Sequence, residues 1–445
     1  MLNRNIAISV ASLAYIFIFI FINSGNLSSI VGGFSNPIGF LFTPFGLSWL
    51  IFTLIAGGFL IFANYLMKSL GPKKIEMETY QRFSKGGVEK LKRNDPNFSA
   101  ESFLTNCSKL ASKLNTAWTK NNMNLVRNLV SSGIYNRFRL QLELMKEEGV
   151  ENHMKNWFLD TIDLISVEID PVYQTAHVEI NARAKDVTLP LNTPKDEIEK
   201  SLTESPQEMY YEVWSFVRKT SAITKKDQGL LNGNCPNCGA NIEDIGESNQ
   251  CKQCKTVINS GEYDWVLAEI TQKIEWKPGQ SSGSIDLTSI REQNSSVNRQ
   301  VIEDRASYLF WRWIEARVEG SFQPLKRYSS PKLLNSIQVK KDYIAEAAVG
   351  AVDLKNCLIE GEEISAKVQV VWSASFSKGQ EPINRRNTLT LKLPIQSVIS
   401  QGLSECSCNT CGAPLPESDS LKCEYCGDEI PPVVSDWLLD QIKEG

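Results

Sequence analysis

The chain has 445 residues, 42% of them apolar, and its 47 basic residues nearly balance its 51 acidic residues. This length and apolar content predict two to four domains with hydrophobic cores, and they exclude a disordered or collagenous protein. The charge balance excludes a protein that coats nucleic acid through a global positive field. Because His153 and His177 are the only histidines, catalysis that needs several imidazoles is excluded as well.

The first 70 residues are expected to form a transmembrane helical hairpin. No charged residue occurs between Asn5 and Met67, and the two apolar runs 6–22 and 47–67 are each long enough to cross about 30 Å of hydrocarbon as a helix. Glycine, proline and phenylalanine residues are frequent in the loop between the runs. The alternative that 6–22 is a cleaved signal sequence stays open.

The segment 71–94 is predicted to be a basic linker, and the charges around it set the expected orientation. Eight lysine and arginine residues occur from Lys68 to Arg93, whereas only Arg4 precedes the first apolar run. Positive residues that flank a membrane segment stay on the cytoplasmic side. Everything after Lys68 is therefore expected to face the cytoplasm, whether or not the first run is cleaved.

Residues 95–233 are predicted to form an α+β domain. Three β-rich runs at 165–170, 176–184 and 210–218 follow a helical segment, and Pro171 lies in the first turn between strands. A helix followed by an antiparallel sheet is typical of α+β folds. The helix is predicted from apolar residues at the helical period: Phe103, Cys107, Leu110, Leu114 and Ala117.

The segment 234–275 is predicted to hold a zinc ribbon followed by a helix. Each Cys-x-x-Cys pair can lie on one tight turn, so two such turns place four thiolates around a tetrahedral zinc ion. The two pairs are separated by twelve residues, and their four cysteines are Cys235, Cys238, Cys251 and Cys254.

The second half of the chain repeats this order. We expect a linker rich in Ser, Gly and Gln at 276–298 and a second α+β domain at 299–404, with strands at 347–354, 364–376 and 388–393. A second ribbon and a C-terminal helix are expected at 405–445, with a second cysteine quartet of Cys408, Cys411, Cys423 and Cys426. Residues 251–270 align with 423–442 without a gap, which indicates an internal duplication.

Both quartets are expected to bind structural zinc, two ions per chain. Four thiolates fill the coordination shell and leave no position for water or substrate. A disulfide framework and a redox-active Cys-x-x-Cys pair are the alternatives, and the reducing cytoplasm disfavours the first. Cys107 and Cys357 are expected to be buried apolar residues, while Cys406 is an alternative ligand. Three glycines suit the positive φ that follows such a turn: Gly239, Gly412 and Gly427.

The charge around the ribbons disfavours a nucleic-acid partner. Acidic residues repel phosphate, so the ribbons are interpreted as structural supports or protein-binding knobs. The first ribbon is flanked by Glu243, Asp244 and Glu247, and the second by Glu417, Asp419, Glu424, Asp428 and Glu429 against Lys422 alone.

Several motifs of the first half resemble a known family. The Asp95-Pro96-Asn97-Phe98 sequence before a helix that ends near Trp118, the segment 125–135 and the run 212–218 are similar to the Tim-forty-four-like domain. The resemblance implies the cone fold of the nuclear transport factor two superfamily, a bacterial cytoplasmic (inner) membrane location, membrane association and protein binding. It carries over no catalytic residues. The fold class is then α+β, with a transmembrane hairpin and two tandem cone-shaped domains, each followed by a four-cysteine zinc ribbon.

Three residues of the 212–218 run are candidates for a binding pocket. Trp214, Phe216 and Arg218 are expected to line the cone cavity, whereas the second half has Thr388, Thr390 and Lys392 in the comparable strand. The alternative is that both aromatic residues are ordinary core residues and the arginine lies on the surface.

We expect a non-enzymatic, zinc-binding adaptor or scaffold that binds a protein, or a lipid, at the membrane, in a role linked to protein transport or the assembly of membrane complexes. The competing hypothesis is a small hydrolase or isomerase in a cone fold that uses Asp170 and His177, with zinc serving only structure. His177 can equally be a hydrogen-bonded strand residue. The sequence leaves the partner and the oligomeric state open.

Overall fold

The computed structural model describes residues 86–225, 229–242, 248–276, 285–397, 399, 402–404, 406–416 and 420–444. All of them belong to the second of two units of the chain, Tyr80–Gly445. The predicted transmembrane hairpin at 1–70 and most of the predicted basic linker lie outside the described residues. Within the described ranges, no helix is both long and apolar enough to cross a bilayer.

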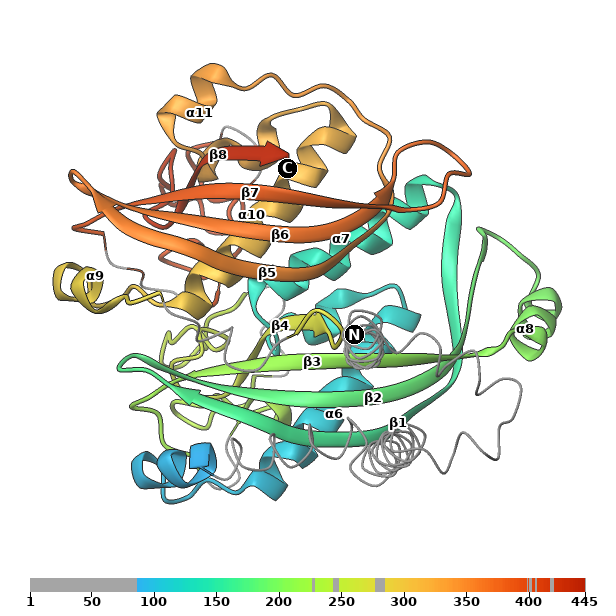
Figure 1. Ribbon diagram of the computed structural model, residues 1–445, viewed down its shortest axis with the longest axis horizontal. Coiled ribbons are helices and arrows are strands. Elements are labelled where there is room, and N and C mark those ends of the chain that lie inside the picture. Colours follow the sequence, from blue (N-terminus) through green and yellow to red (C-terminus); the bar gives the residue numbers. More distant parts are fainter. Residues whose placement is uncertain are drawn as a thin grey trace, which may run out of the picture. The chain divides into compact units, whose positions relative to one another are not determined.

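The first module is a helical layer packed on a curved antiparallel sheet. Its four strands pair in chain order, β1-β2-β3-β4, and every neighbouring pair is antiparallel (Figure 1). Its strands are β1 Val150–Ile169, β2 Tyr173–Pro190, β3 Gln207–Lys219 and β4 Val266–Gln272, and its helices are α6 Ala100–Thr119, η1 Met123–Val126, α7 Ser132–Glu147, α8 Lys195–Glu204 and η2 Leu230–Asn232.

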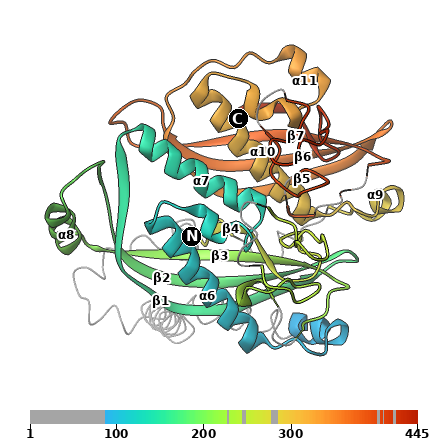
Figure 2. The same ribbon diagram turned by 180° about the vertical axis from the view of Figure 1, so that it is seen from behind.

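The second module has the same order of elements. Its strands pair as β5-β6-β7-β8, again antiparallel throughout. Figure 2 shows α6 lying across the first sheet and α10 across the second. The strands are β5 Ala345–Glu360, β6 Glu363–Ser375, β7 Ile383–Pro394 and β8 Leu438–Glu444, and the helices are α9 Thr288–Gln293, α10 Arg299–Glu319, η3 Gln323–Tyr328 and α11 Pro331–Ser336. The mixed α+β class and its two antiparallel sheets are therefore confirmed.

The prediction of a helix after each ribbon is wrong. Both segments are strands, β4 and β8, and each completes the sheet of its own module. A short apolar run such as 266–270 fits both the helical period of 3.6 residues and a buried strand. Pairing with a strand that is distant in sequence decides between the two. Each ribbon consequently lies between the third and fourth strands of a module and does not follow a finished domain.

Equivalent contacts in the two modules confirm the internal duplication. The backbone N–H of Ser131 donates to the carbonyl of Leu267 at 2.9 Å, and that of Ser330 donates to Leu439 at 2.9 Å. The hydroxyl groups of Ser131 and Ser330 also cap α7 and α11, each accepting from the backbone N–H three residues on. Ser131 and Ser330 are thus equivalent helix starts in the two modules.

Helix α7 contributes to the cores of both modules. Ile134 packs in the first core, whereas Leu140 and Leu144 pack in the second with α10. Arg137, between them, donates to the carbonyl of Ile270 in β4 at 3.0 Å and to that of Val349 in β5 at 2.8 Å. Two facing sheet edges are therefore joined through one buried guanidinium.

The predicted linker at 276–298 is only partly a linker. Its second part contains α9, and Leu287, Ile290 and Val297 are buried in the second core. Asn298 is fully buried and caps α10 by accepting from the backbone N–H of Val301 at 2.8 Å. The polar composition concealed these apolar anchors, which lie three to seven residues apart.

Candidate functional site

The two cysteine quartets are built from four copies of one tight turn. In each copy the backbone N–H of the residue after the second cysteine donates to the carbonyl of the first cysteine, at 2.8 or 2.9 Å. That residue has positive φ in all four turns, which glycine adopts without strain. Three of these residues are the predicted glycines, and the fourth is a lysine: Gly239, Lys255, Gly412 and Gly427.

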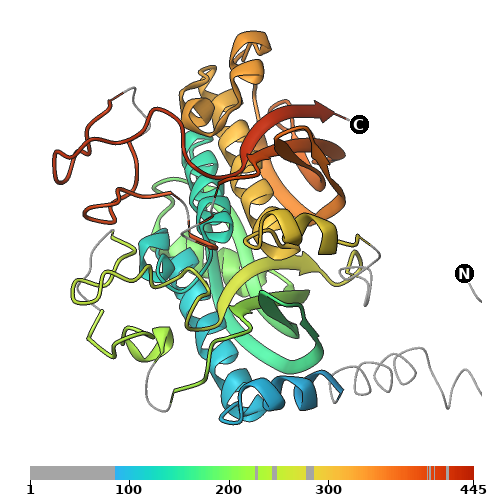
Figure 3. The same ribbon diagram turned by 90° about the vertical axis from the view of Figure 1, so that its left-hand side faces the viewer.

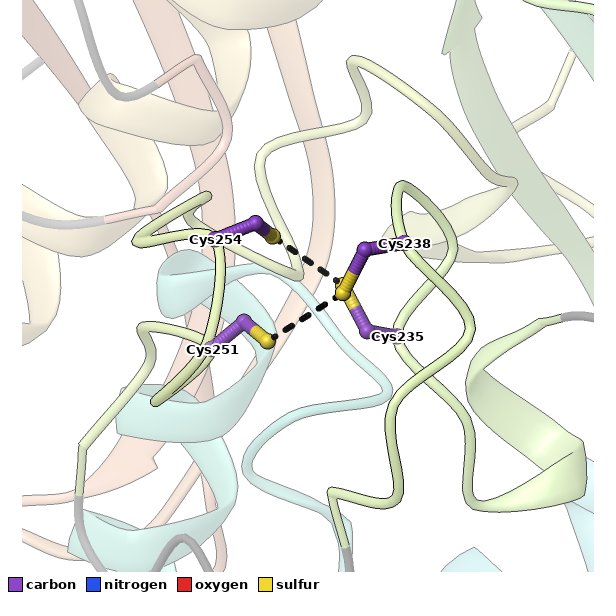
Figure 4. Close-up of side chains that lie close together, drawn as sticks. All are labelled: Cys235, Cys238, Cys251 and Cys254. Atoms are coloured by element: carbon purple, nitrogen blue, oxygen red, sulfur yellow. Dashed lines mark hydrogen bonds between the residues drawn. The ribbon is translucent and has the colours of Figure 1, made fainter.

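The sulfur positions fit a tetrahedral metal site. All four Sγ atoms of each quartet lie within 4.8 Å of one another. The pairs Cys235–Cys254 and Cys238–Cys251 are each 3.7 Å apart (Figure 4), and the corresponding pairs of the second quartet are 3.6 and 3.7 Å apart. Zinc–sulfur bonds of about 2.3 Å in a tetrahedron give sulfur–sulfur distances of about 3.8 Å. A disulfide needs about 2.05 Å, and none of the eight quartet cysteines forms one.

The two ribbons contact each other, on the same side of the unit (Figure 3). The backbone N–H of Asn249 donates to the carbonyl of Gly412 at 3.3 Å, and the hydroxyl of Ser248 donates to the carbonyl of Cys411 at 3.1 Å. The segment just before Cys251 in the first ribbon therefore directly contacts the Cys408–Cys411 turn of the second.

The three remaining cysteines lie outside both quartets. Cys107 and Cys357 are buried, as predicted, and burial raises the pKa of the Cys357 thiol to about 12. Cys406 lies 3.7 Å from a carboxylate oxygen of Asp436. Within the described residues, Cys406 is not part of a group of three ligand atoms close enough to share a metal ion.

A cavity of about 840 Å³ opens beside the first half of α6, and we call it the α6 cavity. Its walls come from α6, from the chain between β3 and the first ribbon, and from residues 263–265. Aromatic rings form much of the apolar surface, and Phe103 lies 5.1 to 5.7 Å, between ring centroids, from Trp265, Phe216 and Phe98. Pro236 also lines the α6 cavity, so the Cys235–Cys238 turn of the first ribbon borders this cavity.

The structure separates the three predicted pocket residues. Phe216 lines the α6 cavity, whereas Trp214 and Arg218 do not. Trp214 is a buried core residue whose indole N–H donates to the carboxylate of Glu212 at 2.8 Å. Arg218 is only 1% exposed. It is therefore not available to a ligand in the cavity, and it is not the surface residue of the alternative interpretation either.

Arg218 takes part in a buried network that the sequence did not reveal. It pairs with Asp95 at 2.9 Å, donates to the hydroxyl of Thr224 at 3.0 Å, and stacks 4.6 Å from the ring centroid of Trp265. Burial lowers the pKa of Arg218, and its hydrogen bond to Asp95 opposes that effect. Asp95 lies 123 positions earlier in the chain, in the Asp95-Pro96-Asn97-Phe98 sequence before α6. A charged residue inside an apolar strand was the available signal.

Asp170 and His177 are not brought together as a catalytic pair. Asp170 closes the β1–β2 turn by accepting from the backbone N–H groups of Val172 and Tyr173, both at 2.7 Å. His177 Nδ1 instead lies 2.9 Å from the hydroxyl of Ser215 on the neighbouring strand.

Comparison with known proteins identifies a large part of the first module. Residues 84–229 match the Tim44-like domain family, the family that the sequence motifs resemble, so this part of the chain contains a Tim44-like domain. Among solved structures, one similar chain is described as an "Ntf2 like protein involved in plasmid conjugation", at 10% identity and a TM-score of 0.15, covering 62% of this chain and 90% of that chain. No curated protein matches the sequence.

Proposed function

We propose that this protein is a non-enzymatic, membrane-anchored adaptor at the cytoplasmic face of a bacterial inner membrane. Its Tim44-like domain would hold a segment of a partner protein in the α6 cavity, and two structural zinc ions would stabilise the ribbons. The observation that carries this proposal is the α6 cavity itself. Its volume of about 840 Å³ is within the usual range of ligand sites, roughly 300–1,000 Å³.

The lining of the α6 cavity favours a peptide over a lipid. Besides its aromatic rings, it presents hydroxyl and amide side chains that can pair with a peptide backbone: Asn97, Ser99, Ser102, Thr105, Asn106 and Asn232. Charges of both signs, Glu101, Lys109 and Lys225, lie at the same site. An anionic lipid head would favour lysine and arginine alone.

Crosslinking in intact membranes tests this proposal. Ile223 lines the cavity and is 42% exposed, so a photocrosslinking phenylalanine analogue at that position should capture a protein. Ser102→Trp should fill the cavity and abolish the crosslink. Ser112→Trp is the matched control, since both serines are exposed positions of α6 and only the first lines the cavity.

Three outcomes decide between the ligand classes. A protein adduct lost with Ser102→Trp and kept with Ser112→Trp supports the adaptor. A phospholipid adduct with the same dependence would replace the protein partner by a lipid. Capture that is equal in both tryptophan variants would remove the α6 cavity from the proposal.

A further inference from the structure

A second, smaller cavity lies between the two modules, and we call it the acidic cavity. Its volume is about 80 Å³, which is room for two or three water molecules at roughly 30 Å³ each. The first module contributes residues of β1 to β4, and the second contributes the start of α10 and part of β5. It is separate from the α6 cavity and from both cysteine quartets, so its function is independent of the proposed adaptor site.

Carboxylates dominate the wall of the acidic cavity. Among the described lining residues there are six carboxylates and one guanidinium, that of Arg299. Arg299 pairs with Glu303 at 2.7 Å and with Asp353 at 3.8 Å. The six carboxylates are Glu168, Glu269, Glu275, Glu303, Asp304 and Asp353. Arg137 offsets part of this charge, since it lies 3.5 Å from Glu269, and the remaining negative charge costs free energy unless a bound cation or protons neutralise it.

Buried acceptor atoms lining this cavity lack donors. One carboxylate oxygen of Asp304, which is 1% exposed, one of Glu269 and the amide oxygen of Gln300 accept no hydrogen bond. These three unmet oxygens outnumber the unpaired ring nitrogen of the same wall, Nε2 of His177, which lies 3.6 Å from Glu168. An unmet buried acceptor is costly, so the set calls for a group with several donors. Trp276 lines the same cavity, 5.5 Å from the ring of His177.

These features match an ammonium group better than a metal ion. A –NH₃⁺ group carries three donors and one positive charge, and it is attracted to the face of an indole ring. Within the described residues, only the cysteine quartets bring three ligand atoms within 4.8 Å of one another. Three carboxylates of the acidic cavity therefore do not converge on one metal ion, and a bound ammonium group would need the amide oxygen of Gln300 as one of its acceptors.

We propose that the acidic cavity binds the ammonium group of a primary amine. The amine is either a free alkylamine or the side chain of a lysine presented by a protein, and the chemistry of recognition is the same for both. Because residues of both modules line the cavity, a bound ammonium joins them. The two modules are close together at Glu275. A Cβ placed on Gly350 of β5 would lie 3.1 Å from a carboxylate oxygen of Glu275.

Calorimetric titration of the full-length protein in detergent tests this proposal. The probes are 1,4-diaminobutane for a free amine and Nα-acetyl-lysine methylamide for a lysine side chain. Nα-acetyl-norleucine methylamide, which keeps the aliphatic stem without the ammonium, is the control ligand, and calcium chloride tests for a metal site. Saturable binding of either amine, without binding of norleucine, is expected, and the amine that binds identifies the source.

The matched variants are chosen at the rim so that the fold survives. Glu275 is exposed and Asp353 is 43% exposed at its side chain, so Glu275→Gln with Asp353→Asn removes two charges without burying a new group. This double variant should weaken amine binding by about tenfold or more. Glu204→Gln with Glu362→Gln removes two exposed charges elsewhere and should leave binding unchanged.

Four results would overturn the proposal. They are no saturable binding of either amine, equal binding of the norleucine control, equal affinity in the rim variant and the wild type, or saturable binding of calcium that the rim variant abolishes. If the rim variant melts at a lower temperature than the wild type, Asp353→Asn alone repeats the comparison.

Discussion

Arg218 joins three segments of the first module that are far apart in sequence. Its guanidinium contacts Asp95 before α6, Thr224 after β3 and Trp265 before β4. Thr224 and Trp265 also line the α6 cavity. The network therefore shapes that cavity without exposing the arginine to a ligand.

Arg218→Ala should destabilise the protein before it affects any partner. The change leaves Asp95 buried without its cation, which typically costs about 3–5 kcal/mol. The melting temperature should fall clearly, and metal content should stay the same because no ligand cysteine is touched. Arg183→Ala is the control, since Arg183 pairs with Asp160 at 3.1 Å with side chains 43% and 32% exposed. Exposed pairs contribute about 0–1 kcal/mol. Equal melting temperatures for the two variants would contradict the structural role of Arg218.

Glu269 and Asp304 make the stability of the protein depend on pH. Burial raises the pKa of Glu269 to about 8 in spite of Arg137, and raises that of Asp304 to about 7. In the unfolded chain these carboxyls titrate near pH 4. Between pH 4 and 8 the folded protein thus holds protons that the unfolded chain has lost. Their contribution to the free energy of unfolding is complete below pH 4 and is lost as pH rises through 7 and 8.

Glu269→Gln should flatten this dependence. An uncharged amide removes the proton whose uptake links folding to pH, so the decline in melting temperature between pH 5 and 8 should become shallower than in the wild type. Glu363→Gln, at a half-exposed side chain, should keep the wild-type slope. A parallel decline in all three proteins would show that Glu269 titrates normally.

The sequence could not predict which residue pairs with the buried charge of Arg218. The motif around Trp214, Phe216 and Arg218 was found, and Phe216 does line a cavity. The pairing of Arg218 with Asp95, 123 positions away, depends on how the chain after β3 folds back on α6. Local spacing carries no information on such a contact.

At the scale of elements, sequence spacing predicted the two cysteine quartets well and the strand register poorly. The Cys-x-x-Cys turns are local, so their geometry follows from neighbouring residues. In β7, by contrast, the residues equivalent to Trp214 and Phe216 are Leu389 and Leu391, each paired with the same position of the duplicated last strand. The prediction of Thr388 and Thr390 was one residue out of register, and a slip of one residue exchanges the two faces of a strand.

Each ribbon should support the last strand of its sheet, because it connects the third strand to the fourth. Cys251→Ser is expected to reduce metal content from two zinc ions to about one, since a structural zinc site supplies on the order of 10 kcal/mol of folding free energy. Amide hydrogen exchange in β4 should then quicken. Cys357→Ser, at a buried cysteine outside both quartets, should keep two metal ions.

Two results would contradict the assignment of the ribbons. One is a Cys251→Ser protein that retains two metal ions. The other is a wild-type protein with fewer than two metal ions and with disulfides inside the quartets.

At the scale of the whole molecule, the two modules are one unit because α7 belongs to both. The sequence predicted two tandem domains with a linker between them, and the duplication supported that view. Yet Leu140 and Leu144 of the first module pack in the second core, and Arg137 joins β4 to β5. The periodicity within each half carries no signal for contacts between the two repeats. The modules should therefore unfold together.

The membrane topology is the prediction that belongs to the complete chain. The 63 residues from Asn5 to Met67 carry no charge, and eight basic residues follow from Lys68 to Arg93. From the positive-inside rule we predict that both ribbons lie in the cytoplasm, where thiolates would stay reduced and available to zinc. Protease added outside intact cells should leave everything after Lys68 uncut, while the same protease should digest it after the membrane is permeabilised. A periplasmic protein of known location serves as the control for protease access. Digestion of the ribbons from outside intact cells would reverse the orientation, and it would also remove the reducing environment on which the preference for zinc over disulfides depends.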